Sequence, residues 1–149
     1  MMNLLIRYIQ VIIKKELFGK PASNFMNREP VTVDTSTSIS DLVENYIYKY
    51  HYKVFPVLEK DELKGMVTAR EVKEFPRDQW EQHHVDEITM PCSDQNTISP
   101  GEDAMKALSL MKSSGSSRLL VVDNNELVGV VTLKDMIDYL SLKSDFEGD

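Results

Sequence analysis

The stretch Gly129–Asp135 reads GVVTLKD, and it repeats a phrase, GMVTARE, that the chain has already used at Gly65–Glu71. In both copies an apolar run follows a glycine and ends in a threonine, and an acidic residue comes three positions later. Self-similarity of this kind is the signature of an internal repeat, in which each copy is one supersecondary unit. The chain is therefore expected to contain two similar units.

The composition is that of a soluble globular protein. The chain has 149 residues, of which 42% are apolar and 28% charged, enough for one ordinary domain with a real core. The formal net charge of −7 argues against a general nucleic-acid surface, for which a basic face is expected. Cys92 is the only cysteine, so no intrachain disulfide can form, and a reducing, cytoplasmic location is the simple prediction.

The N-terminal segment, residues 1–21, has the longest hydrophobic pattern. Its apolar residues recur at helical spacing and comprise Leu4, Leu5, Tyr8, Ile9, Ile12, Ile13 and Leu17. The pattern is too short and too interrupted to span a bilayer, and it lacks the small-residue cleavage site of a signal peptide. Gly19 and Pro21 end the predicted helix. Two interpretations stay open: a helix that packs on this domain or on its dimer mate, and a connector to something larger.

Residues 22–75 form the first predicted unit. A strand at 31–33 is followed by a helix, by two strands at 54–58 and 63–68 around a charged turn, and by a second helix. The first helix would bury a face made of Ile39, Leu42, Val43, Tyr46 and Ile47. This order is strand, helix, strand, strand, helix.

Residues 85–140 repeat that order. Strands are expected at 96–98, 118–123 and 127–132, and a Ser/Gly-rich loop at 113–117 follows the first helix. Neither unit could bury both its sheet and its helices alone, so the two are expected to pack together and to leave clefts at their junction.

Two further segments complete the predicted organisation. Residues 76–84 form a linker in which Trp80 is expected to anchor on the surface of the fold, and residues 141–149 form a polar C-terminal tail.

The threonine and the acid of the repeated phrase allow two interpretations. Thr68 and Glu71 have the spacing of a capping box, in which the hydroxyl accepts from the N–H of the acid and the carboxylate reaches back to the N–H of the threonine. Asp135 is one methylene shorter and reaches back to Thr132 less easily. A short carboxylate beside a helix N-terminus can instead accept hydrogen bonds from two ribose hydroxyls, while the helix start and Arg118 favour a phosphate. For the second phrase, capping alone and ribose binding both stay open.

Two units of about 55 residues that each contain this phrase resemble a tandem pair of CBS domains, the Bateman module. The resemblance covers residues 22–140 and rests on FPVLEKDELKGMVTAREV and LLVVDNNELVGVVTLKDM. It implies an α/β (α+β) fold of two βαββα repeats packed through their sheets, with an N-terminal helix in front. It also implies two interface clefts for adenosine-containing nucleotides, assembly into a homodimer, and regulation of an attached or partner protein.

The resemblance assigns a ligand site to six residues: Thr32, Val33, Ser117, Arg118, Thr132 and Asp135. Asp135 matches the family's ribose acid and Thr132 the adjacent hydroxyl, whereas Ser117 and Arg118 match positions that meet phosphate. The first two of the six match the strand whose backbone reads adenine. The implied ligand is AMP, ADP, ATP or another adenosine compound, and no cofactor is required.

A mirror-related second site would use Lys53, Thr68, Glu71, Thr97 and Ile98. Glu71 stands where the family has an aspartate, so the second phrase of the chain is the expected ribose binder.

A narrower resemblance concerns the flanking segments. The opening RYIQVIIKKELFGKPASNFM and the linker FPRDQWEQHHVDEITMP resemble those of CBS pairs appended to prokaryotic site-2-type intramembrane zinc metalloproteases. This implies a cytosolic regulatory part whose partner is a membrane-embedded protease domain, and it favours the connector interpretation of the N-terminal helix.

The residues do not predict an enzyme. The chain lacks the HExxH motif of such proteases, and His51, His83 and His84 present no set of metal ligands, so a surface histidine pair and no metal are expected. No base is evident near Cys92. The leading hypothesis is a ligand-sensing regulatory module. The alternatives are a ligand-free structural dimerisation module and an enzyme that uses Cys92 or the histidines.

Overall fold

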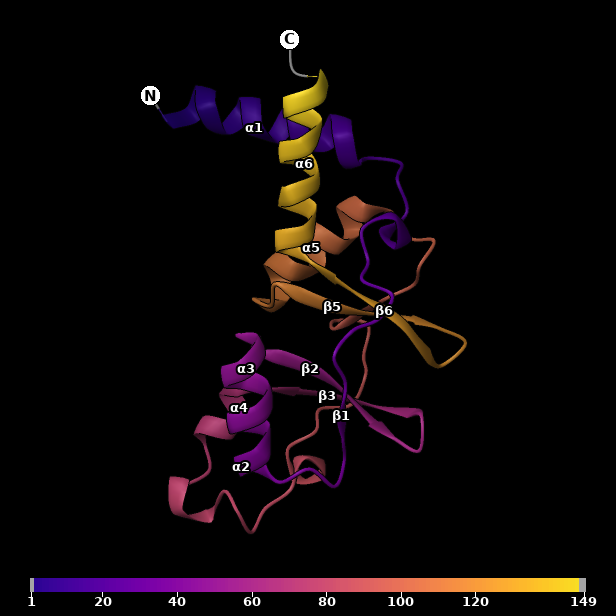
Figure 1. The fold of residues 1–149 in the computed structure, drawn as a ribbon. Coiled ribbons are helices and arrows are strands. Elements are labelled where there is room, and N and C mark those ends of the chain that lie inside the picture. The colour runs from indigo at the N-terminus through magenta and orange to yellow at the C-terminus, as the bar shows by residue number, and fades with distance from the viewer. Residues whose placement is uncertain (1, 148–149) are drawn as a thin grey trace. The chain divides into compact units, whose positions relative to one another are not determined.

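The computed structural model describes residues 2–147 and divides into two compact units (Figure 1). The first-repeat unit comprises Glu29–Ser93. The second-repeat unit comprises the residues up to Arg28 and those from Asp94 onward. Each unit contains a three-stranded sheet with helices beside it, so the predicted mixed α/β fold class is confirmed.

The elements of the first-repeat unit are β1 (Val33–Asp34), α2 (Ile39–Leu42), the π-helical turn η2 (Val43–Ile47), α3 (Tyr48–Tyr50), β2 (Val54–Glu59), β3 (Glu62–Thr68), α4 (Ala69–Lys73), η3 (Arg77–Gln79) and η4 (Val85–Glu87). β1 runs parallel to β2, and β2 runs antiparallel to β3. The predicted helix face is confirmed, because Ile39, Leu42 and Val43 are buried in the core around Phe55. The helix is interrupted by η2 rather than continuous.

The elements of the second-repeat unit are α1 (Met2–Leu17), η1 (Ala22–Asn24), β4 (Thr97–Ile98), α5 (Ala104–Ser114), β5 (Arg118–Asp123), β6 (Glu126–Thr132) and α6 (Leu133–Glu147). The sheet order β4-β5-β6 repeats that of the other unit. The predicted N-terminal helix is confirmed, and Gly19 follows it with φ +83°. α6 extends through the segment predicted as a polar tail as far as Glu147, and the last two residues of that segment lie outside the described residues.

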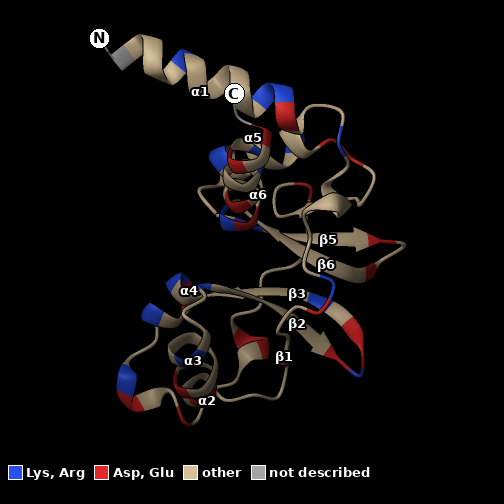
Figure 2. Cartoon of the chain, turned by 45° about the horizontal axis from the view of Figure 1, so that its top comes forward, with Lys and Arg blue, Asp and Glu red and all other residues tan. Residues whose placement is uncertain are grey.

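Each hairpin turns through two residues with positive φ. These are Lys60 and Asp61 between β2 and β3, and Asn124 and Asn125 between β5 and β6. Two consecutive left-handed residues are typical of the tight turns whose twist matches antiparallel strands. Figure 2 shows that acidic residues flank both hairpin tips.

The glycine of the repeated phrase lies where another segment crosses the hairpin. In the second-repeat unit, Asn27 and Val130 exchange backbone hydrogen bonds of 2.8 and 3.0 Å. In the first-repeat unit, Met66 and Met90 do the same at 2.9 and 2.8 Å. The crossing segment leaves no room for a side chain, since a Cβ on Gly129 would come within 2.8 Å of the carbonyl oxygen of Asn27.

Each compact unit therefore includes the segment with which the other sequence repeat begins. Residues 22–28 stand before the first strand of the first repeat but belong to the second-repeat unit. Residues 85–91 stand before the first strand of the second repeat but belong to the first-repeat unit. The compact units are therefore not the two sequence repeats taken separately.

The linker is anchored through its tryptophan, as predicted. The indole N–H of Trp80 donates to the carbonyl of Phe75 at 3.1 Å, and the half-buried ring packs against the core of the first-repeat unit. Within residues 2–147 no helix is long and apolar enough to cross a membrane.

Candidate functional site

Four of the predicted ligand residues meet where β5 begins and β6 ends. Arg118 pairs directly with Thr132 in the antiparallel register, and the N–H of Leu133 donates to the carbonyl of Ser117 at 2.9 Å. Asp135 follows in the first turn of α6. The hairpin thus brings Ser117, Arg118, Thr132 and Asp135 to one end of the second-repeat sheet.

Thr132 caps α6. Its hydroxyl oxygen accepts from the backbone N–H of Asp135 at 3.0 Å, and the side chain is 7% exposed. A threonine in this position satisfies one of the N–H groups that a helix start leaves without a partner. The hydroxyl hydrogen of Thr132 has no acceptor among residues 2–147, so it can still donate.

The carboxylate of Asp135 takes no part in this cap. It is half-buried and forms no hydrogen bond or ion pair with any other residue between 2 and 147. A carboxylate in the first turn of a helix is stabilised by the helix dipole and accepts hydrogen bonds strongly. The capping and ribose-binding interpretations are therefore compatible, because the hydroxyl caps the helix while the carboxylate stays available.

The serine-rich loop fixes the start of β5. Gly115 ends α5 with φ +73°, and the hydroxyl of Ser116 both accepts from the N–H of Arg118 at 3.3 Å and donates to its carbonyl at 3.0 Å. Ser117 itself is exposed, and Arg118 is half-buried. Sequence reasoning missed Ser116. A serine two residues before a strand, in a loop, is a recognisable turn signal that could have identified it.

The first repeat differs at the equivalent place. The hydroxyl of Thr68 donates to the carboxylate of Glu71, and it makes no hydrogen bond to the start of α4. The predicted capping box at these two residues is therefore wrong. The extra methylene of Glu71 lets its carboxylate meet the threonine hydroxyl instead of the threonine N–H. Val54 occupies the position that Arg118 has in the second repeat.

The remaining predicted residues are divided between the units. Val33 begins β1 and is 1% exposed, and Thr32 precedes it, so both belong to the first-repeat unit. Lys53 is exposed before β2, and its carbonyl accepts from the N–H of Ala69 at 2.8 Å. The other two residues of the predicted second site, Thr97 and Ile98, form β4 in the second-repeat unit.

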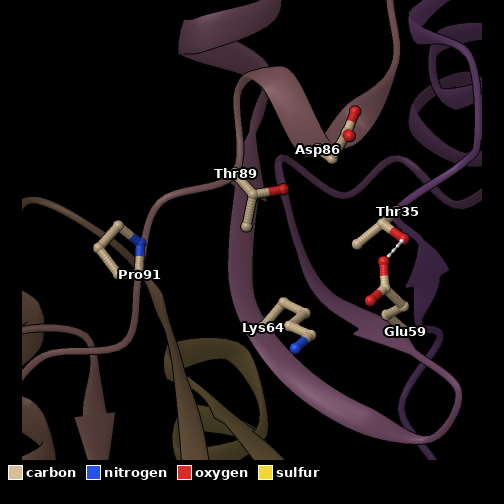
Figure 3. Close-up of a pocket in the computed structure, with 6 residues that line it drawn as sticks. All are labelled: Thr35, Glu59, Lys64, Asp86, Thr89 and Pro91. Carbon is tan, nitrogen blue, oxygen red and sulfur yellow. Dashed lines mark hydrogen bonds between the residues drawn. The ribbon is translucent and has the colours of Figure 1, made fainter.

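The structure also contains surface pockets, one away from every predicted ligand residue and one that includes two residues of the predicted second site. One, of about 310 Å³, lies in the first-repeat unit and is lined by Thr35, Glu59, Lys64, Asp86, Thr89 and Pro91 (Figure 3). Within it the hydroxyl of Thr35 donates to Glu59 at 2.9 Å. Another, of about 360 Å³, lies in the second-repeat unit and includes Thr97, Ile98 and the Asn124–Asn125 turn. The first holds none of the predicted ligand residues.

The histidine pair contacts a single carboxylate. His83 Nδ1 lies 2.8 Å from Glu87, whose other oxygen accepts from the backbone N–H of His84 at 2.6 Å. The hydrogen bond from His83, and then that from the backbone of His84, lower the pKa of Glu87 below its ordinary value. Among residues 2–147 no group of three side chains is arranged to hold a metal ion.

Replacing the cap gives a testable consequence. Thr132→Val should lower the free energy of unfolding by about 1 kcal/mol, because valine keeps the shape but cannot accept the helix N–H. Urea unfolding of the whole chain measures this difference. Thr132→Ser keeps the hydroxyl and serves as the control. Wild-type stability in the valine variant would show that the hydroxyl does not cap α6.

A family model for the CBS domain matches residues 22–78 and 85–142. Among curated proteins of Methanocaldococcus jannaschii, the chain is 28% identical over 116 residues to the uncharacterized protein MJ0188, covering 77% of this chain and 42% of that protein. It is 26% identical over 120 residues to an inosine-5′-monophosphate dehydrogenase, covering 79% of this chain and 23% of the enzyme. The chain thus spans less than half the length of these relatives.

Solved structures share the fold. The CBS domain of a bacterial CNNM/CorC family Mg²⁺ transporter, in complex with ATP, matches with a TM-score of 0.72 and 22% identity, covering 88% of this chain and 94% of that one. Hypoxic Response Protein I matches with a TM-score of 0.67 and 18% identity, covering 80% and 98%. The solved structures thus share the fold, and the family match to both repeats shows that the chain belongs to the CBS-domain family and carries a tandem pair of CBS domains.

Proposed function

We propose that this chain is a regulatory module that binds an adenosine nucleotide at the end of the second-repeat sheet, where α6 begins. Asp135 accepts hydrogen bonds from the ribose hydroxyls, Thr132 donates beside it, and Ser117 and Arg118 contact phosphate. Thr32 and Val33 remain the proposed adenine contacts. The observation that carries the proposal is the Asp135 carboxylate, which is held in the first turn of a helix without a partner among residues 2–147.

The same reasoning favours one binding end over the other. In the first repeat the carboxylate of Glu71 is already occupied by Thr68, and valine stands where the second repeat has Arg118. A ligand there would have to displace the hydrogen bond between Thr68 and Glu71. It would also lack the contact with an arginine that Arg118 offers in the second repeat. The site at Lys53, Thr68 and Glu71, with Thr97 and Ile98, is therefore proposed as the weaker one.

In this proposal the module regulates the activity of another protein. A nucleotide changes the activity of a partner only if it binds one arrangement of the module better than another. We propose that the chain works in the cytoplasm as a homodimer through its CBS pair and controls an attached or separate partner. The resemblance of the flanking segments makes a membrane-embedded metalloprotease the proposed partner. The dehydrogenase relative supports the attached case, since the matched region is under a quarter of that enzyme.

A thermal-shift screen tests the binding step. The purified chain is melted with AMP, ADP, ATP, S-adenosylmethionine and NAD, and with GTP as the matched base control. A ligand at about 100 times its dissociation constant adds about 2.7 kcal/mol to the free energy of unfolding, which raises the melting temperature by several degrees. A shift with adenosine compounds is expected. No shift with any of them would favour the alternative, a ligand-free structural dimerisation module.

A further inference from the structure

Helix α1 exposes a row of large apolar side chains. Leu4, Tyr8 and Val11, spaced by four and three residues, share one face and are 75%, 65% and 64% exposed. Only the last turns of α1 pack on the core, through Ile13 and Leu17. An apolar face of this kind on a helix normally packs against another element, because packing supplies most of the stability of a helix in a protein.

The far end of α6 exposes a second apolar patch in the same unit. Leu142 and Phe146 lie one turn apart and are 57% and 84% exposed. Phe146 is the more exposed of the two, and among the described residues it does not belong to the hydrophobic core of the unit. Two exposed apolar faces therefore belong to the two terminal helices of one unit (Figure 1).

The two helices carry net charges of opposite sign. Arg7, Lys14 and Lys15 lie on α1, and the only acidic residue of that helix is Glu16 in its last turn. Exposed acidic residues, Asp138 and Asp145, border the patch on α6, and Lys143 lies between its two apolar residues in the sequence. Asp138 pairs with Lys134 at 2.8 Å, and Lys143 pairs with Glu147. With four acidic and two basic residues, α6 has a net charge of −2, whereas α1, with three basic residues and one acidic residue, has +2. Opposite net charges on two helices with exposed apolar faces favour their association.

From these observations we propose that α1 of one copy packs against the Leu142–Phe146 face of α6 in a second copy, and that the reverse contact forms at the same time. Such a contact is self-complementary, as the interface of a twofold dimer requires. It continues a contact that exists within each copy, because Glu16 at the end of α1 lies 3.8 Å from Lys143 on α6. The inference rests on the proposed homodimer and names its surface.

A second copy fits these faces better than a lipid surface. The acidic residues on α6 would be repelled by anionic headgroups, whereas they complement the basic residues of α1. The apolar residues of α1 also extend over most of its circumference, since Leu5 and Ile9 are 63% and 45% exposed on other sides. A helix that lies flat on a membrane has one apolar side and a strongly charged opposite side.

The test is the oligomeric state of the whole chain by sedimentation velocity. Tyr8→Glu on α1 and Phe146→Glu on α6 are compared with Tyr48→Glu, which places the same charge at a 55% exposed tyrosine of the first-repeat unit. The wild type and Tyr48→Glu should be dimers. In Tyr8→Glu and Phe146→Glu the dissociation constant of the dimer should rise at least about tenfold. Reversing Arg7 and Lys15 to Glu should weaken the dimer, and reversing Asp138 and Asp145 to Lys as well should restore it.

Several outcomes would overturn the proposal. One is a wild-type chain that stays monomeric across the micromolar range, and another is a dimer that Phe146→Glu leaves intact. A monomer that cosediments with vesicles containing anionic lipid, and loses this with Tyr8→Glu, would assign α1 to a membrane surface instead. Circular dichroism confirms that each variant is folded. Nucleotide titration of the same variants tests the nucleotide site separately from the dimer contact. The ligand residues are not altered in these variants, so nucleotide binding can persist when the dimer contact is lost.

Discussion

Asp135→Ala should weaken adenosine-nucleotide binding by roughly 1.5–3 kcal/mol, which is a roughly 10- to 150-fold rise in the dissociation constant. The variant removes charge-assisted hydrogen bonds to the ribose. It should lower the free energy of unfolding by no more than about 1 kcal/mol, the usual value of a carboxylate beside a helix N-terminus, because no hydrogen bond of the carboxylate to residues 2–147 would be lost. Isothermal titration gives the affinity, and urea unfolding gives the stability of the same preparation.

Glu71→Ala is the matched control in the first repeat. It removes an acid at the equivalent position, but that acid already accepts from Thr68, so the variant should affect stability more than affinity. The contrast between the two variants is the informative result. Equal and negligible effects on affinity would remove Asp135 from the site.

Gly65→Ala should lower the free energy of unfolding by at least about 3 kcal/mol. Overpacking alone usually costs up to about 3 kcal/mol, and the strained backbone adds to that cost. A Cβ at Gly65 would overlap the carbonyl oxygen of Met90 and lie 2.9 Å from its carbonyl carbon. The residue also has φ +149°, which side chains other than hydrogen rarely allow. The crossing backbone would have to move and would lose its two hydrogen bonds to Met66.

Gly101→Ala is the control for this substitution, because a Cβ there meets nothing within 4 Å. Gly129→Ala should have an intermediate effect, since part of its contact is with the flexible side chain of Met26. Denaturant unfolding ranks the three variants. If Gly65→Ala were as stable as Gly101→Ala, the crossing of residues 85–91 over the hairpin would be contradicted.

The local structure was largely predictable from the sequence because its signals are short in range. The polar turn residues Lys60–Asp61 and Asn124–Asn125 indicate the two hairpins. The spacing of apolar residues predicts the buried helix face that begins at Ile39. The repeated phrase predicted two similar units with the same strand order. Each of these inferences depends on residues within one or two turns of each other.

Other features could not be predicted because they depend on residues that are distant in the chain. Nothing near Gly65 indicates that Met90 crosses it, and only the structure gives a physical reason for the glycine in each phrase. The capping box predicted at Thr68 and Glu71 was wrong, whereas capping by Thr132 was one of the two interpretations left open. Thr132 caps its helix and Thr68 does not, since one methylene decides which group the neighbouring acid reaches.

The most direct test of the account compares ATP with 2′,3′-dideoxy-ATP by isothermal titration, using the wild-type chain and Asp135→Ala. The wild type should bind ATP more tightly than the dideoxy compound, and the variant should bind both with similar, weak affinity. The lost discrimination would show that the ribose hydroxyls and the Asp135 carboxylate interact with each other. Discrimination of the same size in both proteins would contradict the claim that this carboxylate binds the ribose.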